Sequence, residues 1–373
     1  MRILINAANI HVGGGVQVSA SFINDLYIIY SDKEKIPFDI AISTEVFLNL
    51  NKNINTKKFN NFKVINIFGI KKTTIEEKKY FNNVDILFSI FGPFYLKTNA
   101  KIKIVGFAQA WIAYPKNIAY SKLSWINKIK YKLKFFIQGY FFKKNDHIIV
   151  ELEHVKKALI ENQSIASEKI SIIYNAYSDI FNHPEDWNNI QYKKRKYTIG
   201  FLGRAYPHKN LSILTSVADI LKKKYCFDCD FIFTLTPEEM ESLNFNQYDN
   251  FFSTGPLNLT QCPSFYTAID LLIFPSLLES FSITPIESMK MGCPVIASDI
   301  PFVHDICKNS VIYFDPLDPN DIAEKIFLYQ QNKEQQQLNI QQGLKIVESM
   351  PNSMDRTIKY LELITNYMNH IRG

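Results

Sequence analysis

Two glutamates stand in a run that follows a predicted buried strand. Glu279 and Glu287 are separated by seven residues, and Glu279 falls in the loop directly after the strand. Ionised carboxylates accept several charge-assisted hydrogen bonds, so such a pair can hold vicinal hydroxyl groups. Thr284 and Pro285 have the residue types of a helix N-cap and first turn. The alternative is therefore a capping box of Thr284 and Glu287, which would leave Glu279 unexplained.

Two permanent cations follow another predicted strand, at 197–203. Arg204 comes directly after Gly203, and Lys209 comes five residues later. Ligands of open α/β sheets bind at the carboxyl ends of the strands. A planar guanidinium and a compact ammonium suit a diphosphate there. The alternative is a solvated loop with ordinary surface charges.

Three glycines, Gly13, Gly14 and Gly15, lie between the first predicted strand and a helix. Glycine lets the backbone approach a ligand closely, and a helix start leaves N–H groups for an anion. The dinucleotide fingerprint needs a further glycine three residues on and an acidic residue after the second strand. Neither stands clearly in place, so we expect a donor or acceptor loop, with a tight turn as the alternative.

These segments belong to an alternation of short apolar runs and helical patterns that is typical of parallel α/β sheets. The expected strands are 2–7, 39–42, 63–67, 85–89, 102–107, 148–150, 170–174, 197–203, 230–235, 250–253, 271–274, 295–297 and 311–314. The expected helices include 209–224, 262–268, 284–291, 318–330 and a terminal helix at 353–371. The pattern predicts two doubly wound, Rossmann-like domains at 1–180 and 196–350.

Length and composition agree with two globular domains. The chain has 373 residues, of which 47% are apolar and 21% charged, a size and balance that suit two folded cores. No apolar run reaches the roughly 18 residues of a membrane span, and the N-terminus lacks the pattern of a signal peptide. Five cysteines argue against a disulfide scaffold and agree with a cytoplasmic location. Cys226 and Cys229 have no second pair to complete a zinc site, so no zinc site is expected there.

Charge is unevenly distributed along the chain. The net charge is 42 − 36 = +6, but residues 51–150 alone carry 19 lysines and 4 acidic residues. The densest part runs from Lys122 to Lys144, where lysines alternate with aromatic residues on a helical pattern. Such a segment suits an anionic membrane surface. A solvated helix with its aromatic stripe in the core is an equal alternative, and a nucleic-acid groove is a weaker one.

Taken together, the second half resembles glycosyltransferase family 4, whose members are retaining enzymes of GT-B fold that use nucleotide sugars. The resemblance rests on Gly203-Arg204 with Lys209, on Gly255, on the Glu279 to Glu287 run, and on the segment 292–298. It is close over about 197–330 and looser in the first half. It implies two domains that face across a cleft, with the helix 353–373 packing back on the first domain.

The resemblance also implies roles for individual residues. Arg204 and Lys209 would neutralise the donor diphosphate, Glu279 would contact the transferred sugar, and Glu287 would hold the ribose. The remaining donor-binding candidates are backbone or loop positions: Gly14, Gly15, Gly203, Gly255, Phe281, Ser282 and Ile283. Fixed cations stabilise the leaving diphosphate, so the resemblance implies no metal and no other cofactor.

The first domain departs from the family pattern. A histidine is common after its fourth or fifth strand, whereas this chain has Gln109 there, followed by Trp111. An amide does no acid–base work but can hydrogen-bond a sugar hydroxyl. His11, in the glycine loop, is a second candidate on the acceptor side.

The resemblance therefore implies a retaining hexosyltransferase that uses a UDP-sugar in preference to a GDP-sugar. The expected acceptor is a saccharide, lipid-linked, of bacterial O-antigen, lipopolysaccharide or capsule synthesis, at the cytoplasmic face of the inner membrane. The alternatives are a dinucleotide-dependent Rossmann enzyme and a non-catalytic binder of nucleotides or nucleic acid.

Overall fold

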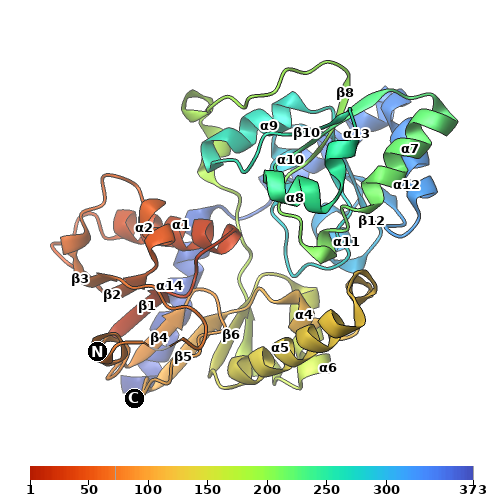
Figure 1. Cartoon of the computed structure of the whole chain (residues 1–373). Helices are drawn as coiled ribbons and strands as arrows, with labels where there is room; N and C mark the ends of the chain where they lie inside the picture. The colour runs from red at the N-terminus through yellow and green to blue at the C-terminus, as the bar shows by residue number, and fades with distance from the viewer. Residues whose placement is uncertain (72, 373) are drawn as a thin grey trace. The chain divides into compact units, whose positions relative to one another are not determined.

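The computed structural model describes residues 1–71 and 73–372 and divides into two compact units (Figure 1). The first unit comprises Met1–Pro115, Lys130–Ala176 and Pro351–Gly373, and the second comprises Lys116–Ile129 and Tyr177–Met350. Each unit contains one parallel sheet with helices between its strands. The expected α/β class with two doubly wound sheets is confirmed.

The first sheet has seven parallel strands in the order β3-β2-β1-β4-β5-β6-β7. Its strands are β1 (Ile3–Ala7), β2 (Ile36–Ile42), β3 (Phe59–Val64), β4 (Ile86–Ser89), β5 (Ile102–Gly106), β6 (His147–Val150) and β7 (Ile170–Ile172). The helices that accompany it are α1 (Gly14–Ile29), α2 (Thr44–Leu48), α3 (Ile75–Tyr80), α4 (Ala110–Ala113), α5 (Trp125–Lys143), α6 (Glu153–Gln163) and α14 (Ser353–Arg372). Every residue of β1 is buried, as expected for a parallel strand covered on both faces.

The last helix, α14, packs on the first unit although it follows the second unit in the sequence. It contacts α1 and lies beside β4 (Figure 1). Arg356 is 2% exposed and donates to Asn175 Oδ1 and Ser21 Oγ, and Thr357 donates to Asp25. Buried polar groups need such partners, so this network anchors α14 at one position on α1.

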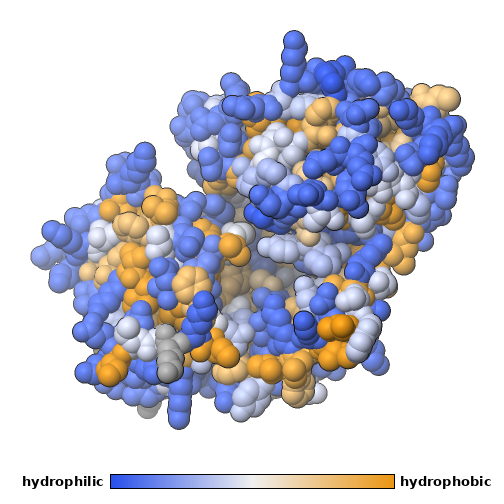
Figure 2. Space-filling view, viewed as in Figure 1, coloured by the Kyte–Doolittle hydropathy of each residue, from blue (hydrophilic) through white to orange (hydrophobic). Residues whose placement is uncertain are grey.

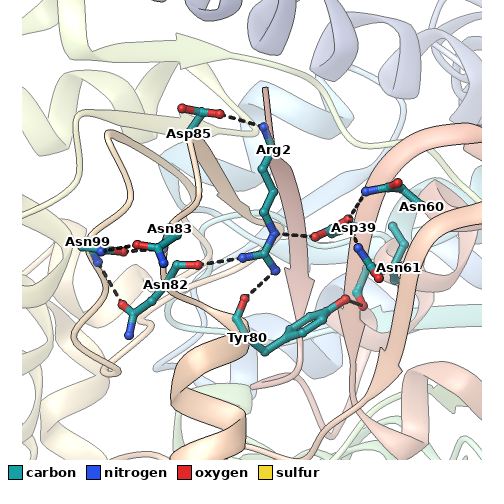
Figure 3. A network of polar contacts seen from close by, with 10 residues as sticks. Arg2, Asp39, Asn60, Asn61, Tyr80, Asn82, Asn83, Asp85 and Asn99 are labelled. Atoms are coloured by element: carbon teal, nitrogen blue, oxygen red, sulfur yellow. Dashed lines mark hydrogen bonds and ion pairs between the residues drawn. The ribbon is translucent and has the colours of Figure 1, made fainter.

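A second polar network joins the amino ends of the first strands (Figure 3). The Arg2 guanidinium donates to Asp39 at 2.6 Å and to the carbonyls of Tyr80 and Asn82 at 2.7 and 2.6 Å. The Arg2 backbone N–H donates to Asp85. Because Arg2 precedes β1, this network stabilises the edge of the sheet opposite the carboxyl ends.

The second sheet has six parallel strands in the order β10-β9-β8-β11-β12-β13. Its strands are β8 (Tyr197–Phe201), β9 (Cys229–Phe233), β10 (Phe251–Ser253), β11 (Leu271–Phe274), β12 (Val295–Ser298) and β13 (Ile312–Phe314). Its helices are α7 (Ile213–Tyr225), α8 (Pro237–Ser242), α9 (Cys262–Ala268), α10 (Thr284–Lys290), α11 (Pro301–Cys307), α12 (Pro319–Gln331) and α13 (Lys333–Glu348). Phe231, Phe233, Phe245 and Phe251 pack ring against ring in its core.

Two sequence-based boundaries are wrong. The strand expected at 63–67 is Phe59–Val64, because the buried Phe59 begins the pairing opposite Ile36. The helix expected from 209 begins at Ile213, because Asn210 has a φ of +57° and interrupts the helical path after a 3-10 turn at Pro207–Lys209. Within the described residues, no helix combines the length and the apolar character that crossing a membrane requires.

Candidate functional site

The candidate site is the carboxyl edge of the second sheet. The strands β10, β9, β8 and β11 are neighbours and all parallel, so they end at one edge. The loops that begin at Gly203, Thr234, Gly255 and Pro275 follow these strands closely. This is the edge at which open parallel sheets bind ligands, and the predicted donor-side residues of the second half lie in these loops or in the elements directly after them.

Gly203 begins the first of these loops. Its φ of +151° favours glycine, and a Cβ there would lie 3.1 Å from the Phe201 ring. The Gly203 N–H donates to Thr234 Oγ1 at 2.9 Å, and the Thr234 hydroxyl lies 3.2 Å from the Gly203 carbonyl. The hydroxyl therefore fixes the loop after β8 against the loop after β9.

Arg204 lies at the same edge and is held by a carboxylate. Its Nε donates to Glu239 Oε1 at 2.9 Å, and the same oxygen accepts from the Ala205 N–H at 3.0 Å. Glu239 also completes a capping box with Thr236 at the start of α8. Burial raises the pKa of Glu239, but hydrogen bonds from Thr236, Ala205 and Arg204 outweigh burial and lower it overall. Glu239 is thus an ionised anchor, and the guanidinium stays half exposed.

Lys209 and Glu279 form an ion pair between the loops after β8 and β11. Both side chains are only 13% exposed. The Leu277 N–H donates to the His208 carbonyl at 2.7 Å and holds the two loops together. The ammonium also lies 5.3 Å from the centre of the Phe274 ring. The structure therefore brings together the two residues that the sequence singled out for diphosphate and sugar.

His208 also lies near the Glu279 carboxylate. Its Nε2 is 4.0 Å from Glu279 Oε1, and its ring stacks on Tyr206. Burial lowers the pKa of His208, and the nearby Glu279 only partly opposes this effect. The ring is therefore neutral at physiological pH, so the positive charge beside Glu279 is that of Lys209.

Glu287 is buried inside α10 and is 6% exposed. The hydroxyl of Tyr266, from α9, donates to Glu287 Oε2 at 2.9 Å. Burial raises the pKa of Glu287 to about 7, although the Tyr266 hydrogen bond acts in the opposite direction. This carboxyl group therefore changes its protonation state near neutral pH.

The expected cap of this helix is wrong, and so is its capping-box alternative. The N-cap is Ile283, whose φ of −78° and ψ of −24° are already helical, and no side chain caps the helix. Thr284 is consequently the first helical residue, and its carbonyl accepts from Tyr266 at 3.3 Å. Glu287 therefore does not cap the helix, and its carboxylate accepts a hydrogen bond from Tyr266 instead.

The other predicted donor-side residues of the second unit surround these charges. Ser282 is buried, and Phe281 and Ile283 are half-buried in the loop before α10. Gly255 has a φ of +72°, and a Cβ there would meet no atom within 4 Å. The positive φ favours glycine in the turn after β10, and the space beside Gly255 is open.

In the first unit, the glycine loop begins α1. Gly13 is the N-cap with a φ of +68°, Gly14 is the first helical residue, and a Cβ at Gly15 would lie 3.1 Å from the Ile10 side chain. His11 Nδ1 lies 2.9 Å from Glu45 Oε2, and Nε2 lies 3.0 Å from the Ile67 carbonyl. Both ring nitrogens of His11 are thus engaged within the first unit.

Gln109 and Trp111 flank the start of α4. Gln109 is its N-cap, and the backbone carbonyl of Gln109 accepts hydrogen bonds from the N–H groups of Ile112 and Ala113. Trp111 is 7% exposed, and its ring stacks parallel to Phe135 of α5 with a centroid separation of 5.7 Å. Trp111 is therefore placed in the packing between α4 and α5, while Gln109 stays half-buried at the carboxyl end of β5.

The dinucleotide alternative meets a specific obstacle in the first unit. An acidic residue that holds a ribose would stand just after β2, and Ser43 occupies that place. Ser43 is fully buried, donates to the Ile10 carbonyl and caps α2. Its hydroxyl is thus used to join the loops after β1 and β2.

Comparison with known proteins assigns the segment that holds these charges. Residues 182–345 match the family model described as "Glycosyl transferases group 1". This part of the chain is therefore similar to that family. The resemblance noted from Gly203, Lys209, Glu279 and Glu287 is thereby confirmed.

Matches that extend beyond this segment agree with the assignment. The O-antigen chain mannosyltransferase RfbU of Salmonella typhimurium is 25% identical over 243 residues, which cover 64% of this chain and 60% of RfbU. The glycosyltransferase WaaG, involved in lipopolysaccharide biosynthesis, superposes with a TM-score of 0.67 at 12% identity over 98% of this chain and 100% of its own. HepE of Anabaena, solved with UDP and glucose, has a TM-score of 0.65 at 13% identity over 98% of this chain and 99% of its own. These structures establish the GT-B fold for the whole chain.

Three residues of the candidate site were not predicted from the sequence. For Glu239 the sequence does carry a signal, because the segment Thr236-Pro237-Glu238-Glu239 has the spacing of a capping box. Tyr266 and Thr234 had none, because a tyrosine in an amphipathic helix and a threonine after a strand are ordinary residues there. Only the fold places their hydroxyl groups on Glu287 and Gly203.

Proposed function

We propose that this protein is a retaining glycosyltransferase that moves a hexosyl group from a nucleoside diphosphate sugar to a saccharide acceptor. The single observation that carries the proposal is the Lys209–Glu279 ion pair at the carboxyl edge of the second sheet. It lies within the segment that matches group 1 glycosyl transferases. A cation and a carboxylate held together there suit a substrate with a diphosphate next to a sugar.

In this proposal Lys209 and Arg204 stabilise the departing diphosphate. The bond from the sugar C1 to the diphosphate oxygen breaks, and its electron pair leaves on that oxygen. The acceptor hydroxyl oxygen bonds to C1 from the same face, and its proton passes to the leaving diphosphate. Fixed cations aimed at developing negative charge are usually the largest source of such stabilisation, so Lys209 and Arg204 take this role without a metal ion in the proposed step.

The two glutamates then act at different parts of the donor. Glu279, beside Lys209, accepts hydrogen bonds from hydroxyls of the transferred sugar. Glu287, buried and bonded to Tyr266, accepts from the ribose hydroxyls in its ionised form. Because burial raises the pKa of Glu287 to about 7, we expect donor affinity to fall as the pH drops below 7.

Names of similar proteins narrow the substrates to be tested. RfbU is named as an O-antigen chain mannosyltransferase, whereas HepE was solved with UDP and glucose. We propose a hexose as the transferred sugar, with UDP-sugars tested first and GDP-mannose beside them. The proposed acceptor is a lipid-linked saccharide of O-antigen, lipopolysaccharide or capsule synthesis.

A donor panel that monitors nucleotide release tests the proposal, with the anomeric configuration of the product read by NMR. We expect one donor to be turned over with retention. Lys209→Ala and Glu279→Ala should each lower its turnover by at least about 100-fold. Inversion would contradict the same-face displacement. A specific ligand stabilises the folded state and raises the Tm. A rise in Tm on adding NAD, together with no rise on adding any nucleotide sugar, would instead favour a dinucleotide enzyme.

A further inference from the structure

The helix α5 carries a row of apolar side chains that is open to solvent. We call this the α5 stripe. Its members are between 45% and 77% exposed: Trp125, Ile126, Ile129, Leu133, Phe136, Ile137 and Tyr140. Isolated exposed apolar residues are ordinary, but a continuous exposed patch of this kind marks an interaction site. Figure 2 shows apolar surface along the position that α5 occupies in Figure 1.

Helical geometry explains why these residues form one surface. Trp125, Ile129, Phe136 and Tyr140 are separated by four, seven and four residues, which places them on one face of a helix. The opposite side of α5 is the one that packs inward, through the buried Phe135, Gly139 and Phe142. The stripe is thus a second apolar face of α5, additional to the face that packs inward.

The charges of α5 are of one sign. The helix contains five lysines and no acidic residue, and Lys144 follows its last turn. At 100° per residue, Lys128 and Lys132 fall on one side of the stripe, and Lys130 and Lys134 fall on the other. An apolar stripe between two rows of cations has the form of a helix that lies in a membrane interface.

We propose that α5 docks this protein on a bilayer that contains anionic lipid, with the α5 stripe among the upper acyl chains and the lysines at the headgroups. Charge complementarity identifies the occupant. A nucleic acid would match the lysines but would leave Trp125 and Phe136 against phosphates. A bilayer satisfies both features, since its headgroups are anionic and its interior is apolar. With five lysines among 19 residues, α5 lies along the surface and does not cross it.

This inference stands on α5 alone and does not require the proposed glycosyl transfer. If the proposed function is also correct, the same contact would present the enzyme to a lipid-linked acceptor. The experiment below measures vesicle binding without any donor, so failure of one proposal leaves the other open to its own test.

Co-sedimentation of the full chain with vesicles tests the contact. We expect binding to vesicles of phosphatidylcholine with 30% phosphatidylglycerol (about a physiological anionic fraction) and much weaker binding to phosphatidylcholine alone. Each lysine near an anionic surface contributes a factor of about five in affinity, so Lys130→Gln/Lys132→Gln/Lys134→Gln should weaken binding on the order of 100-fold. The matched control is Lys222→Gln/Lys223→Gln/Lys224→Gln on α7, which should bind like the wild type.

The stripe has its own variant, Leu133→Ser/Phe136→Ser. Both side chains are more than half exposed, so the variant should keep the wild-type Tm yet lose binding to anionic vesicles. Equal binding by all variants would overturn the proposal. So would lipid-independent dimerisation, seen by light scattering and abolished by Leu133→Ser/Phe136→Ser, because the stripe would then be covered by a second copy. Binding to duplex DNA that is stronger than binding to anionic vesicles would overturn it as well.

Discussion

The carboxyl edges of the two sheets hold their polar groups in different ways. In the first unit, Asn9 and Ser43 donate to backbone carbonyls of neighbouring loops, and His11 has a partner at each ring nitrogen. In the second unit, Lys209 is paired with Glu279, which follows a different strand. Three of these four partners at the first edge are backbone carbonyls and the fourth is the Glu45 carboxylate, whereas the second edge is joined by the Lys209–Glu279 ion pair.

This difference matters because the two kinds of contact respond differently to a ligand. A hydrogen bond to a buried backbone carbonyl is costly to break, since the carbonyl is left without a partner. A diphosphate can instead approach Lys209 while its partner Glu279 turns to sugar hydroxyls, so each charge stays satisfied. The second edge is therefore suited to exchange partners with a substrate, and the first edge is suited to hold its loops still.

The largest expected effect is at Lys209. Lys209→Ala should lower kcat by about 100- to 1000-fold, the loss typical of removing one group that stabilises a developing anion. Lys209→Arg, which retains the charge, should recover part of the activity. Circular dichroism and Tm would verify the fold. A folded Lys209→Ala variant with full activity would contradict the idea that the Lys209–Glu279 pair at the second edge acts on the substrate.

A pH effect on stability should follow from Glu287. Between the ordinary value of 4.5 and the raised pKa of about 7, the folded protein holds a proton that the unfolded chain has released. The free energy of unfolding therefore decreases as the pH rises through this range, by about 3 kcal/mol from this group. Urea unfolding of Glu287→Gln at pH 5 and pH 8 should show that much less pH dependence than the wild type. Identical profiles would contradict the burial argument.

Donor binding should depend on the same carboxyl group. Glu287→Gln should raise the KM for the donor by about 10- to 100-fold, as expected for loss of hydrogen bonds to a charged acceptor, with a smaller effect on kcat. In the wild type, kcat/KM should rise as the pH passes 7. Tyr266→Phe is the useful second variant, because it keeps Glu287 but removes its hydroxyl partner. A loss in kcat alone would place Glu287 at the reacting sugar and not at the ribose.

Arg204 should matter less than Lys209. Its side chain is half exposed and already paired with Glu239, so solvent competes for its charge. We expect Arg204→Gln to lower kcat/KM by about tenfold. Glu239→Gln should give a related but smaller loss through displacement of the guanidinium. A larger loss of kcat/KM at Arg204 than at Lys209 would show that the more exposed cation, and not the less exposed one, stabilises the departing diphosphate.

The smallest effect should be at His11 in the first unit. His11→Gln breaks contacts with Glu45 and the Ile67 carbonyl, so it should cost about 1 kcal/mol of stability per hydrogen bond lost. We expect kcat to stay within about tenfold of the wild type, because a general base would contribute at least about 100-fold. Loss of turnover with an unchanged Tm would show that the first edge takes part in chemistry after all.

Much of the fold could be predicted from local sequence patterns. The thirteen expected strands are all present, since parallel strands buried on both faces are short apolar runs with few alternatives. Errors arose where backbone conformation departs from the local pattern. Asn210 adopts a left-handed conformation and delays α7, and Ile283 becomes helical before the expected cap at Thr284.

The candidate site was predictable in part for a related reason. Arg204, Lys209 and Glu279 lie in the segments that follow predicted strands, and parallel strands place such segments at one edge of the sheet. Trp111 shows where this reasoning ends. Its sequence position resembles that of a loop residue at the sheet edge, but its ring is buried against Phe135.

What the sequence determined alone was the class of the fold, the edge at which charges gather and the excess of lysine on one helix, because these follow from the order of residues along the chain. Tertiary structure decided which charge meets which. It paired Lys209 with Glu279, buried Glu287 against Tyr266, and left the α5 stripe exposed by packing Phe135 inward instead. Burial and partners depend on segments far apart in sequence, and those are set only when the sheets form.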